Sequence, residues 1–503
     1  MELLKVLETY RESERLAMIT GEKKITYREL WEKSDQLAEY IKSECGENKS
    51  PVIVYGHKSP VMLEAFLACA KSGRAYVPID IHVPRNRIEN IIDSVCPNLI
   101  LATEDFAPYQ AYPCINIEKD TDIFESRKGS VTDPADYVKE EDVYYIIFTS
   151  GSTGIPKGVQ ITYGALNRFT EWALNFGWGG VKSHKCFINQ APFSFDLSVM
   201  DLYMSLASES CLFALEKEVQ TDYKRLFAQL KKSDGNIWVS TPSFADLCLA
   251  DTSFSQKLMP DMELFLFCGE TLTNKTAEQL LKRFPKAQVY NTYGPTESTV
   301  AVTEVCIDEG ILEKYNPLPV GAAKPGTMIK IMDGSRELPE GEKGEIVIIG
   351  DTVSRGYFKN EKENQKAFFS YIHNGKPIPA YRTGDKGYFQ DGWLFYCGRI
   401  DLQIKLHGYR MELEDVEKNL MKLPGIAKAV VIPVSEGGKV KYLKAFCMYN
   451  EPVEDARKLQ KKIKEEMSAF VPDYMIPRKI QFVETLPVTA NGKVDRKRIQ
   501  EIS

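Results

Sequence analysis

The apolar positions in the first 150 residues alternate between short uninterrupted runs and stripes with a helical period. Residues 52–55 and 75–79 are apolar runs of strand length, and between them the apolar positions from 61 to 69 recur on one face of a helix. A strand, a helix and a strand within about 30 residues are typical of a βαβ unit, whose two strands are parallel. Further runs at 99–102 and 143–148 repeat the pattern. The sequence therefore predicts an α/β fold built on parallel sheets.

The character of the chain changes near Gly398. The segment 398–417 is dense in charged residues, and a compact alternation of elements follows it. We expect a helix at 412–421, strands at 429–434 and 442–449, a helix at 453–469 and a strand at 480–483. About 100 residues suffice for a separate small domain. The expected architecture is a large N-terminal α/β domain, residues 1–400, and a small α+β C-terminal domain, residues 401–503.

The composition is that of an ordinary globular protein, and it excludes several functions. Of the 503 residues 43% are hydrophobic and 27% are charged, and the formal net charge of -6 leaves no broad basic surface for nucleic acid or an anionic membrane. The histidines and cysteines are scattered without the paired spacings of a zinc site or a disulfide framework. The N-terminus lacks the apolar core of a signal peptide, and no run of about 18 apolar residues could span a bilayer. We expect a cytoplasmic protein without stable membrane insertion.

The strongest chemical signal is the segment TSGSTGIPKG, residues 149–158, directly after the strand predicted at 143–148. Its glycines allow the backbone to approach a polyphosphate, its hydroxyls can donate to the phosphate oxygens, and Lys157 supplies a cation. The spacing differs from that of a Walker A loop, because Gly158 follows the lysine. The alternative interpretation is a flexible surface turn, which the density of hydroxyls and glycines disfavours.

This segment resembles the phosphate loop of the adenylate-forming superfamily, which includes acyl-CoA synthetases, luciferases and amino-acid adenylation domains. Six further segments resemble successive motifs of that superfamily in the same order, and together they extend from about residue 20 to the C-terminus. They are GRAYVPID, NTYGPTE, GEIVIIGDTVSRGY, YRTGD, YCGRIDLQIKLHGYRMELEDVE and NGKVDR.

The resemblance implies roles for particular residues. ATP would be bound by Thr149, Ser150, Gly151, Ser152, Thr153, Gly154, Lys157, Asn291, Thr292, Tyr293, Gly294, Pro295, Thr296, Asp385, Tyr396, Cys397, Gly398, Arg399 and Lys493. Within this set Asp385 would bind the ribose, and Thr153 would be a further catalytic group. Lys493 would be the adenylation lysine and would also bind the carboxylate of the substrate. Glu297 would hold Mg²⁺, since a hard cation prefers carboxylate oxygen. Taken alone, Glu297 and Lys493 could be solvated loop residues and Asp385 a turn-capping residue.

Asp196, in QAPFSFDLSVMDLY, indicates which acid is activated. In amino-acid adenylating members an aspartate of this motif pairs with the substrate ammonium, and a buried carboxylate requires such a partner. The alternative is an N-cap at the start of the following helix. Met200, Cys268 and Val300 match pocket-lining stretches of the superfamily and predict a pocket for an alanine-sized side chain. Cys268 could equally be a plain buried thiol of the core.

The resemblance extends to the free-standing members that activate D-alanine for a D-alanyl carrier protein, in the first step of lipoteichoic acid D-alanylation. Only the resemblance favours D over L. The chain ends ten residues after Lys493 without a fused carrier domain, so the phosphopantetheine thiol is expected to come from a separate protein. After adenylation the small domain would pivot about Asp401, withdraw Lys493 and admit that thiol. The alternatives are an L-amino-acid adenylation enzyme of the nonribosomal-peptide type, a short-chain acyl-CoA synthetase and a nucleotide-binding regulator without turnover.

Overall fold

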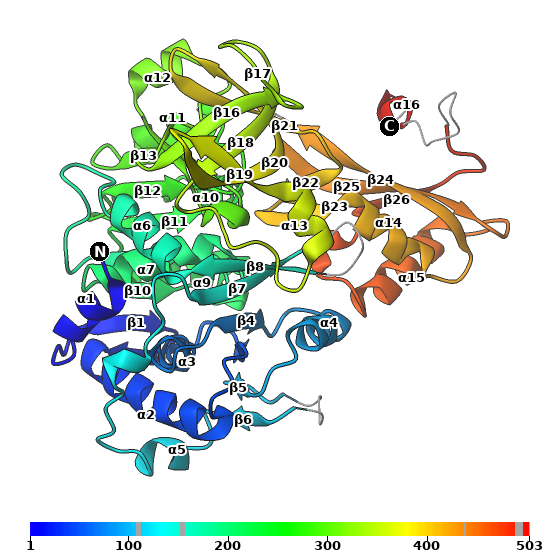
Figure 1. The fold of residues 1–503 in the computed structure, drawn as a ribbon. Coiled ribbons are helices and arrows are strands. Elements are labelled where there is room, and N and C mark those ends of the chain that lie inside the picture. The colour runs from blue at the N-terminus through cyan, green and yellow to red at the C-terminus, as the bar shows by residue number, and fades with distance from the viewer. Residues whose placement is uncertain (107–111, 151–155, 437–438, 488–495, 502–503) are drawn as a thin grey trace. The chain divides into compact units, whose positions relative to one another are not determined.

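The computed structural model describes residues 1–106, 112–150, 156–436, 439–487 and 496–501 (Figure 1). The chain forms two compact units. The first comprises Met1–Ile81, Ser94–Phe148 and Gly158–Ile400, and the second comprises His82–Asp93, Thr149–Lys157 and Asp401–Ser503. The structure has mixed α/β layers, and it has a large N-terminal part followed along the chain by a smaller C-terminal part. The predicted fold class is therefore confirmed.

The first sheet of the larger unit is the one that the apolar runs predict. Its six strands are ordered β6-β5-β3-β4-β7-β8, and the pairs β3–β4, β3–β5, β4–β7 and β5–β6 are parallel. Their bounds are β3 Val52–Gly56, β4 Tyr76–Asp80, β5 Ile100–Ala102, β6 Cys114–Asn116, β7 Val143–Thr149 and β8 Lys157–Thr162. The connection from β3 to β4 is helix α3 (Pro60–Lys71), which Ser59 caps and Pro60 begins. The predicted βαβ unit is therefore confirmed.

The second sheet has nine strands in the order β15-β14-β13-β12-β11-β9-β10-β1-β2, and the stretch from β13 to β1 is parallel. The strands are β1 Leu16–Thr20, β2 Lys23–Thr26, β9 Cys186–Asn189, β10 Cys211–Ala214, β11 Ile237–Ser240, β12 Leu264–Phe267, β13 Gln288–Tyr293, β14 Thr303–Ile307 and β15 Ala322–Ala323. Every residue of β11 and β12 is buried, as expected for parallel strands covered on both faces.

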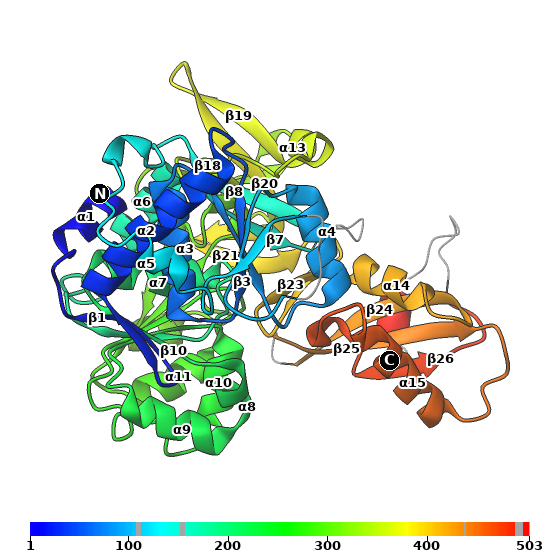
Figure 2. The same ribbon diagram turned by 90° about the horizontal axis from the view of Figure 1, so that it is seen from below.

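Helices cover these two sheets (Figure 2). The helices of the larger unit, with the one that joins β4 to β5, are α1 Leu3–Thr9, α2 Tyr27–Cys45, α3, α4 Arg85–Val95, α5 Asp122–Glu125, α6 Tyr163–Ala173, α7 Leu197–Ala207, α8 Lys217–Thr221, α9 Tyr223–Lys232, α10 Pro242–Leu249, α11 Asn274–Arg283, α12 Glu309–Lys314 and α13 Glu361–Ala367. Helix α7 is buried along its whole length, and Met200 on it has no exposed surface. Within the described residues no helix is long and apolar enough to cross a membrane.

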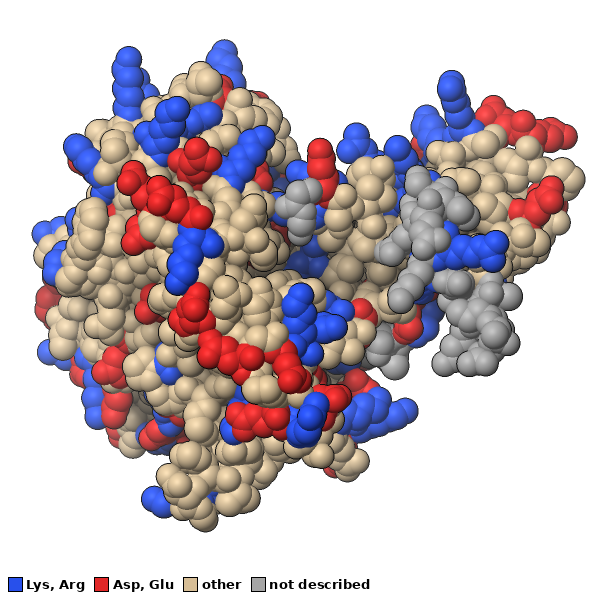
Figure 3. Space-filling view, turned by 90° about the horizontal axis from the view of Figure 1, so that it is seen from above, with Lys and Arg blue, Asp and Glu red and all other residues tan. Residues whose placement is uncertain are grey.

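A third, antiparallel sheet completes the larger unit. Its order is β17-β16-β18-β20-β19, with β21 paired to β20. The strands are β16 Thr327–Asp333, β17 Arg336–Glu337, β18 Gly344–Gly350, β19 Phe368–His373, β20 Lys376–Gln390 and β21 Trp393–Arg399. Over the face that Figure 3 presents, acidic and basic side chains are interspersed.

The second unit contains the elements expected after residue 401. Strands β22 (Gln403–Leu406) and β23 (Tyr409–Glu412) form a hairpin, and β24 (Ile426–Glu436), β25 (Lys439–Tyr449) and β26 (Lys479–Phe482) form a sheet. Its helices beyond residue 401 are α14 Leu413–Met421, α15 Ala456–Ser468 and α16 Arg496–Glu501. The helix expected at 453–469 begins later, because the Asp455 side chain accepts hydrogen bonds from the N–H groups of residues 457 and 458 and so caps it there.

A buried lysine joins α2 to α3 in the larger unit. The ammonium of Lys71 lies 2.9 Å from a carboxylate oxygen of Asp35 and 3.3 Å from the ring centroid of Trp31, and its side chain has no exposed surface. Burial lowers the pKa of Lys71 to about 8, against the opposing effect of Asp35. The ion pair and the ring contact offset the cost of burying the charge.

We expect Lys71→Met to lower the free energy of unfolding by about 3–5 kcal/mol, because it leaves the Asp35 carboxylate buried without its cation. The measurement is urea denaturation followed by circular dichroism. Lys5→Met is the control, since its ion pair with Glu2 is exposed on both sides and contributes at most about 1 kcal/mol. Equal losses in the two variants would contradict a stabilising role for the Lys71–Asp35 pair.

Candidate functional site

The predicted site residues of the larger unit follow the carboxyl ends of neighbouring strands. Strands β9, β11, β12 and β13 are parallel, so the segments that follow them emerge at one edge of the sheet. Residues 190–196 follow β9, Cys268 follows β12, and Gly294–Thr296 follow β13. This is the edge of a parallel sheet at which ligands bind in α/β folds.

Asp196 and Thr296 are brought together although 100 residues separate them in sequence. The Thr296 hydroxyl donates a hydrogen bond of 2.6 Å to a carboxylate oxygen of Asp196. Asp196 occupies the N-cap position of α7, but its φ of -61° and ψ of -27° are helical and its side chain makes no capping hydrogen bond. The alternative interpretation of Asp196 as a helix cap is therefore wrong, since the carboxylate contacts the segment after β13.

Glu297 is fully buried beside Thr296. The Tyr357 hydroxyl donates a hydrogen bond of 2.7 Å to its carboxylate, and its main-chain oxygen accepts one of 2.8 Å from the N–H of Ser354. Such hydrogen bonds are what a buried carboxylate requires. Tyr357 lies in the motif GEIVIIGDTVSRGY, which the sequence singled out without giving this residue a role. A tyrosine at the end of a motif gives no sign of which carboxylate it contacts.

Asp385 contacts Tyr293 and Arg399, and Tyr396 lies next to Tyr293. Its two carboxylate oxygens accept hydrogen bonds from the Tyr293 hydroxyl at 2.6 Å and from the Arg399 guanidinium at 2.8 Å. Burial, and then the negative charge of Asp385, raises the pKa of Tyr293 well above its ordinary value, so the phenol stays a donor. The ring centroids of Tyr293 and Tyr396 are 6.0 Å apart. The arrangement is a fixed carboxylate next to an aromatic face.

Two consecutive β-branched residues adopt the left-handed conformation beside these groups. Thr299 has a φ of 60° and Val300 a φ of 66°, a backbone region that costs about 1–2 kcal/mol per residue. The turn is held by the Cys268 thiol, which lies 3.6 Å from the Val300 carbonyl oxygen, and by the Thr299 hydroxyl, which donates to the Thr352 carbonyl at 2.8 Å. Strain of this kind is typical of functional sites.

Gly294 allows the same turn to approach the segment after β13. A Cβ atom at position 294 would lie 2.5 Å from the Cα of Ala301 and 2.8 Å from the carbonyl oxygen of Val300. Only glycine fits such a close approach of two backbones. Cys268, Val300 and Met200 are buried and belong to one large hydrophobic cluster of the core, so three of the five residues predicted to bind the amino acid lie in that cluster.

Several predicted residues belong to the second unit or lie outside the described residues. Gly151, Ser152, Thr153, Gly154 and Lys493 are outside the described part of the chain. Thr149, Ser150 and Lys157 belong to the second unit, where the Ser150 hydroxyl donates to the carbonyl of Arg410 at 2.8 Å. Cys397 is exposed, Gly398 has a φ of 96°, and Asp401 is exposed at the first residue after the larger unit.

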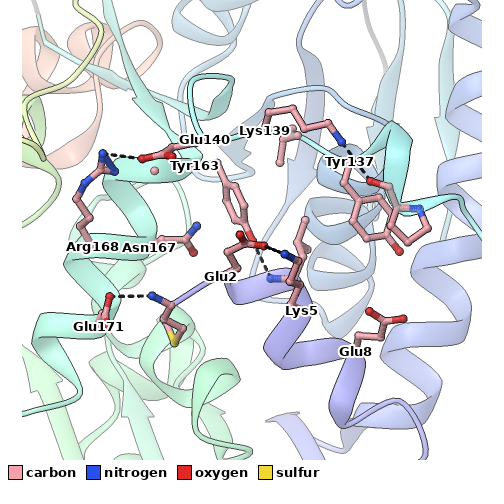
Figure 4. A pocket seen from close by; sticks show the side chains of 15 residues that line it. Glu2, Lys5, Glu8, Tyr137, Lys139, Glu140, Tyr163, Asn167, Arg168 and Glu171 are labelled. Carbon is pink, nitrogen blue, oxygen red and sulfur yellow. Dashed lines mark hydrogen bonds and ion pairs between the residues drawn. The ribbon is translucent and has the colours of Figure 1, made fainter.

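A separate pocket of about 490 Å³ lies at the N-terminal end of the larger unit (Figure 4). It is lined by residues of α1 and α6 and of the segment 134–140, and none of the predicted site residues lines it. Its charged groups pair with one another: the N-terminal ammonium with Glu171 at 2.8 Å, and Arg168 with Glu140 at 2.8 Å. We assign it no function.

The chain matches two family descriptions, AMP-binding enzyme over residues 8–358 and AMP-binding enzyme C-terminal domain over residues 415–493. A protein of Bacillus licheniformis named D-alanine--D-alanyl carrier protein ligase is 47% identical over 505 residues, which are 100% of this chain and 99% of the relative. A protein of the same name from Bacillus cereus is 46% identical over 506 residues, with 99% of each chain covered.

Two solved structures have the same fold. The Vibrio cholerae adenylation domain AlmE, in complex with glycyl-adenosine-5'-phosphate, has a TM-score of 0.82 and 22% identity, with 100% of this chain and 96% of that chain covered. The o-succinylbenzoate CoA synthetase of Bacillus subtilis has a TM-score of 0.83 and 20% identity, with 99% and 98% covered. Together, the full-length relatives and the two matching domain descriptions establish that this chain belongs to the AMP-binding enzyme family.

Proposed function

We propose that this protein is a D-alanine–D-alanyl carrier protein ligase. It would use ATP to form D-alanyl-AMP and then transfer the D-alanyl group to the phosphopantetheine thiol of a carrier protein, the first step of lipoteichoic acid D-alanylation. The observation that carries the proposal is the hydrogen bond between Thr296 and Asp196, because it holds beside the NTYGPTE motif the carboxylate that would pair with a substrate ammonium. The names of full-length relatives at 45–47% identity support the choice of substrate and acceptor.

The nucleotide would lie against the groups gathered around Asp385. The Tyr293 ring would face the adenine, and Asp385, oriented by Tyr293 and Arg399, would bind the ribose hydroxyls. Glu297 fits a magnesium ion, because it is a buried carboxylate that Tyr357 orients through a neutral hydroxyl. When bound, that ion would offset the negative charge of the ATP phosphates.

The amino acid would be held at both of its charged ends. Asp196 would pair with the ammonium, and Lys493 would pair with the carboxylate and draw it toward the α-phosphate. Met200, Cys268 and Val300, all buried, would line the place of the amino-acid side chain and limit it to alanine size. Fixing both charged ends is the condition for telling two enantiomers apart.

The reaction would proceed in two half-reactions. A carboxylate oxygen of D-alanine attacks the α-phosphorus, and pyrophosphate leaves; the thiol sulfur then attacks the acyl carbon, and AMP leaves. The protein would contribute position and charge in the first step, for which Lys157 and Lys493 would supply the cations. Between the steps the domain that begins at residue 401 would turn about Asp401 and withdraw Lys493.

The direct test is an amino-acid-dependent exchange of pyrophosphate into ATP, followed by loading of a phosphopantetheinylated carrier protein. We expect D-alanine to support exchange far better than L-alanine or a short fatty acid, and the carrier protein to acquire D-alanine as a thioester. Preference for an L-amino acid would indicate an enzyme of the nonribosomal-peptide type. Activity with propionate would indicate an acyl-CoA synthetase, and absence of AMP formation with any acid would contradict an enzymatic role.

Asp196→Asn should raise the KM for D-alanine much more than the KM for ATP, since the substitution keeps the size of the side chain and removes the charge that the ammonium would meet. Loss of one charged contact of this kind typically costs about 2–5 kcal/mol. Asp246→Asn is the matched control, because the Thr276 hydroxyl donates to Asp246 at 2.6 Å just as Thr296 donates to Asp196. A raised KM for ATP with an unchanged KM for D-alanine would contradict this role for Asp196.

Cys268→Ala should raise activity toward L-alanine and change activity toward D-alanine much less, because it empties volume next to Val300. A single methyl in a tight pocket is worth about 1–3 kcal/mol. The measurement is the ratio of kcat/KM for the two enantiomers before and after substitution. Cys248→Ala, at a fully buried cysteine of another core cluster, should leave the ratio unchanged. If Cys268→Ala also leaves it unchanged, the selectivity lies with Met200 or Val300.

A further inference from the structure

Lys58 is a buried lysine that the sequence did not single out. Lys58 follows β3 of the six-stranded sheet, and its backbone has a φ of 46°. The residue is 1% exposed. Its ammonium donates hydrogen bonds to the carbonyl oxygens of Gln190 at 2.7 Å, Leu215 at 2.8 Å and Asn189 at 3.4 Å. Three donors meeting three carbonyls is the full capacity of an ammonium group.

These three carbonyls are the carboxyl ends of two neighbouring strands of the other sheet. Asn189 ends β9, Gln190 begins the segment that leads to Asp196, and Leu215 follows β10. Gln220 on α8 donates to the same carbonyls of Gln190 and Leu215, at 2.9 and 2.8 Å. Two side chains from different elements thus hold the same pair of strand ends.

A second contact closes the segment that carries Asp196. The Asn189 amide donates a hydrogen bond of 2.9 Å to Asp201, which lies on α7 five residues after Asp196. Asn189 and Asp201 are both fully buried. The segment from Asn189 to Asp201 is therefore tied across its ends, and its base is attached to the ammonium of Lys58.

The charges of Lys58 and Asp201 oppose the cost of their burial. Burial lowers the pKa of Lys58, while the negative charges of Asp201, Asp80 and Glu216 act in the opposite direction. Burial raises the pKa of Asp201, while its hydrogen bond from Asn189 and the charge of Lys58 act to lower it. An apolar residue would fill the same volume without the free-energy cost of burying a charge. Lys58 therefore does more than fill space.

We infer that Lys58 is a positioning residue for the amino-acid site, which fixes the 190–196 segment and thereby the place of the Asp196 carboxylate. The inference rests on the proposed function, in which Asp196 receives the substrate ammonium. The hydrogen bonds of the Lys58 ammonium go to main-chain carbonyls, so its effect on the reaction would pass through these strand ends. An error of about 1 Å in such a group is enough to weaken binding strongly.

The test compares Lys58→Met with Lys71→Met in the full chain. Both replace a buried lysine by an apolar residue of similar length, and both should lower the temperature of unfolding. We expect Lys58→Met to raise the KM for D-alanine about tenfold, the effect typical of losing an outer-shell partner, and to leave the KM for ATP within about twofold. Lys71→Met should leave both KM values unchanged.

Gln220→Leu is a milder variant in case Lys58→Met does not fold. It removes one donor from the same carbonyls of Gln190 and Leu215 without leaving a buried charge alone, so the KM for D-alanine should rise by a smaller factor in the same direction. In Lys58→Met/Asp201→Asn the lost charge balance is restored but the carbonyls still lack their donor. We expect the unfolding temperature to recover while the KM for D-alanine stays raised.

Three results would overturn the inference: an unchanged KM for D-alanine in both Lys58→Met and Gln220→Leu, equal changes in the KM values for D-alanine and ATP, or recovery of the KM together with stability in the double variant. Failure of the proposed function gives a different result, since the unsubstituted protein would then lack exchange with D-alanine. In that case the same variants are compared with whichever acid supports exchange, and a selective rise in its KM remains the supporting outcome.

Discussion

The hydrogen bond between Thr296 and Asp196 is the contact on which the candidate site depends. It joins the segment after β13 to the segment after β9, and two further strands, β11 and β12, lie between these in the sheet. Thr296 begins a short 3-10 helix, Thr296–Ser298, and Asp196 lies at the start of α7, so the contact joins two helix starts that no strand pairing connects directly. The Asp196 carboxylate and the NTYGPTE motif are therefore joined by one short hydrogen bond between side chains.

The partners of the buried carboxylates differ in a way that matches the proposed roles. Asp385 has the Arg399 guanidinium at 2.8 Å, which offsets its charge and suits a group that would bind the neutral hydroxyls of a ribose. Among the hydrogen bonds described above for Glu297, the one from the Tyr357 phenol orients the carboxylate and brings no charge of its own. That arrangement suits a carboxylate facing a divalent cation. The kind of donor thus distinguishes two acids that look alike in sequence.

The sequence predicted those features that local patterns determine. Apolar runs located β3, β4, β5 and β7 of the six-stranded sheet but not β6 or β8. The motif order indicated that residues 196, 268 and 293–300 would share a site. The sequence did not predict contacts between residues that are far apart along the chain. Whether Asp196 caps α7 or contacts Thr296 is decided 100 residues away, and the carbonyls that hold Lys58 lie 131 to 157 residues from it. A lysine in GHKSP is expected at the surface, because a buried one is rare. The roles given to the site residues stay predictions, and residues 151–154 and Lys493 lie outside the described part of the chain.

The strained, left-handed backbone at Thr299 and Val300 can be explained by the rigidity that it gives the turn. Glycine at either position would adopt this backbone without strain, but it would leave the turn freer to move. At position 300 it would also remove the valine side chain that is proposed to line the amino-acid site. The β-branched side chains restrict the motion of this turn. The Cys268 thiol and the close approach at Gly294 hold its backbone in the unfavourable conformation. Two enantiomers of alanine differ only in where a methyl and a hydrogen lie, so a pocket that selects between them needs a wall that does not yield. The strain is the cost of that rigidity, and the packing around Cys268 and Gly294 sustains it.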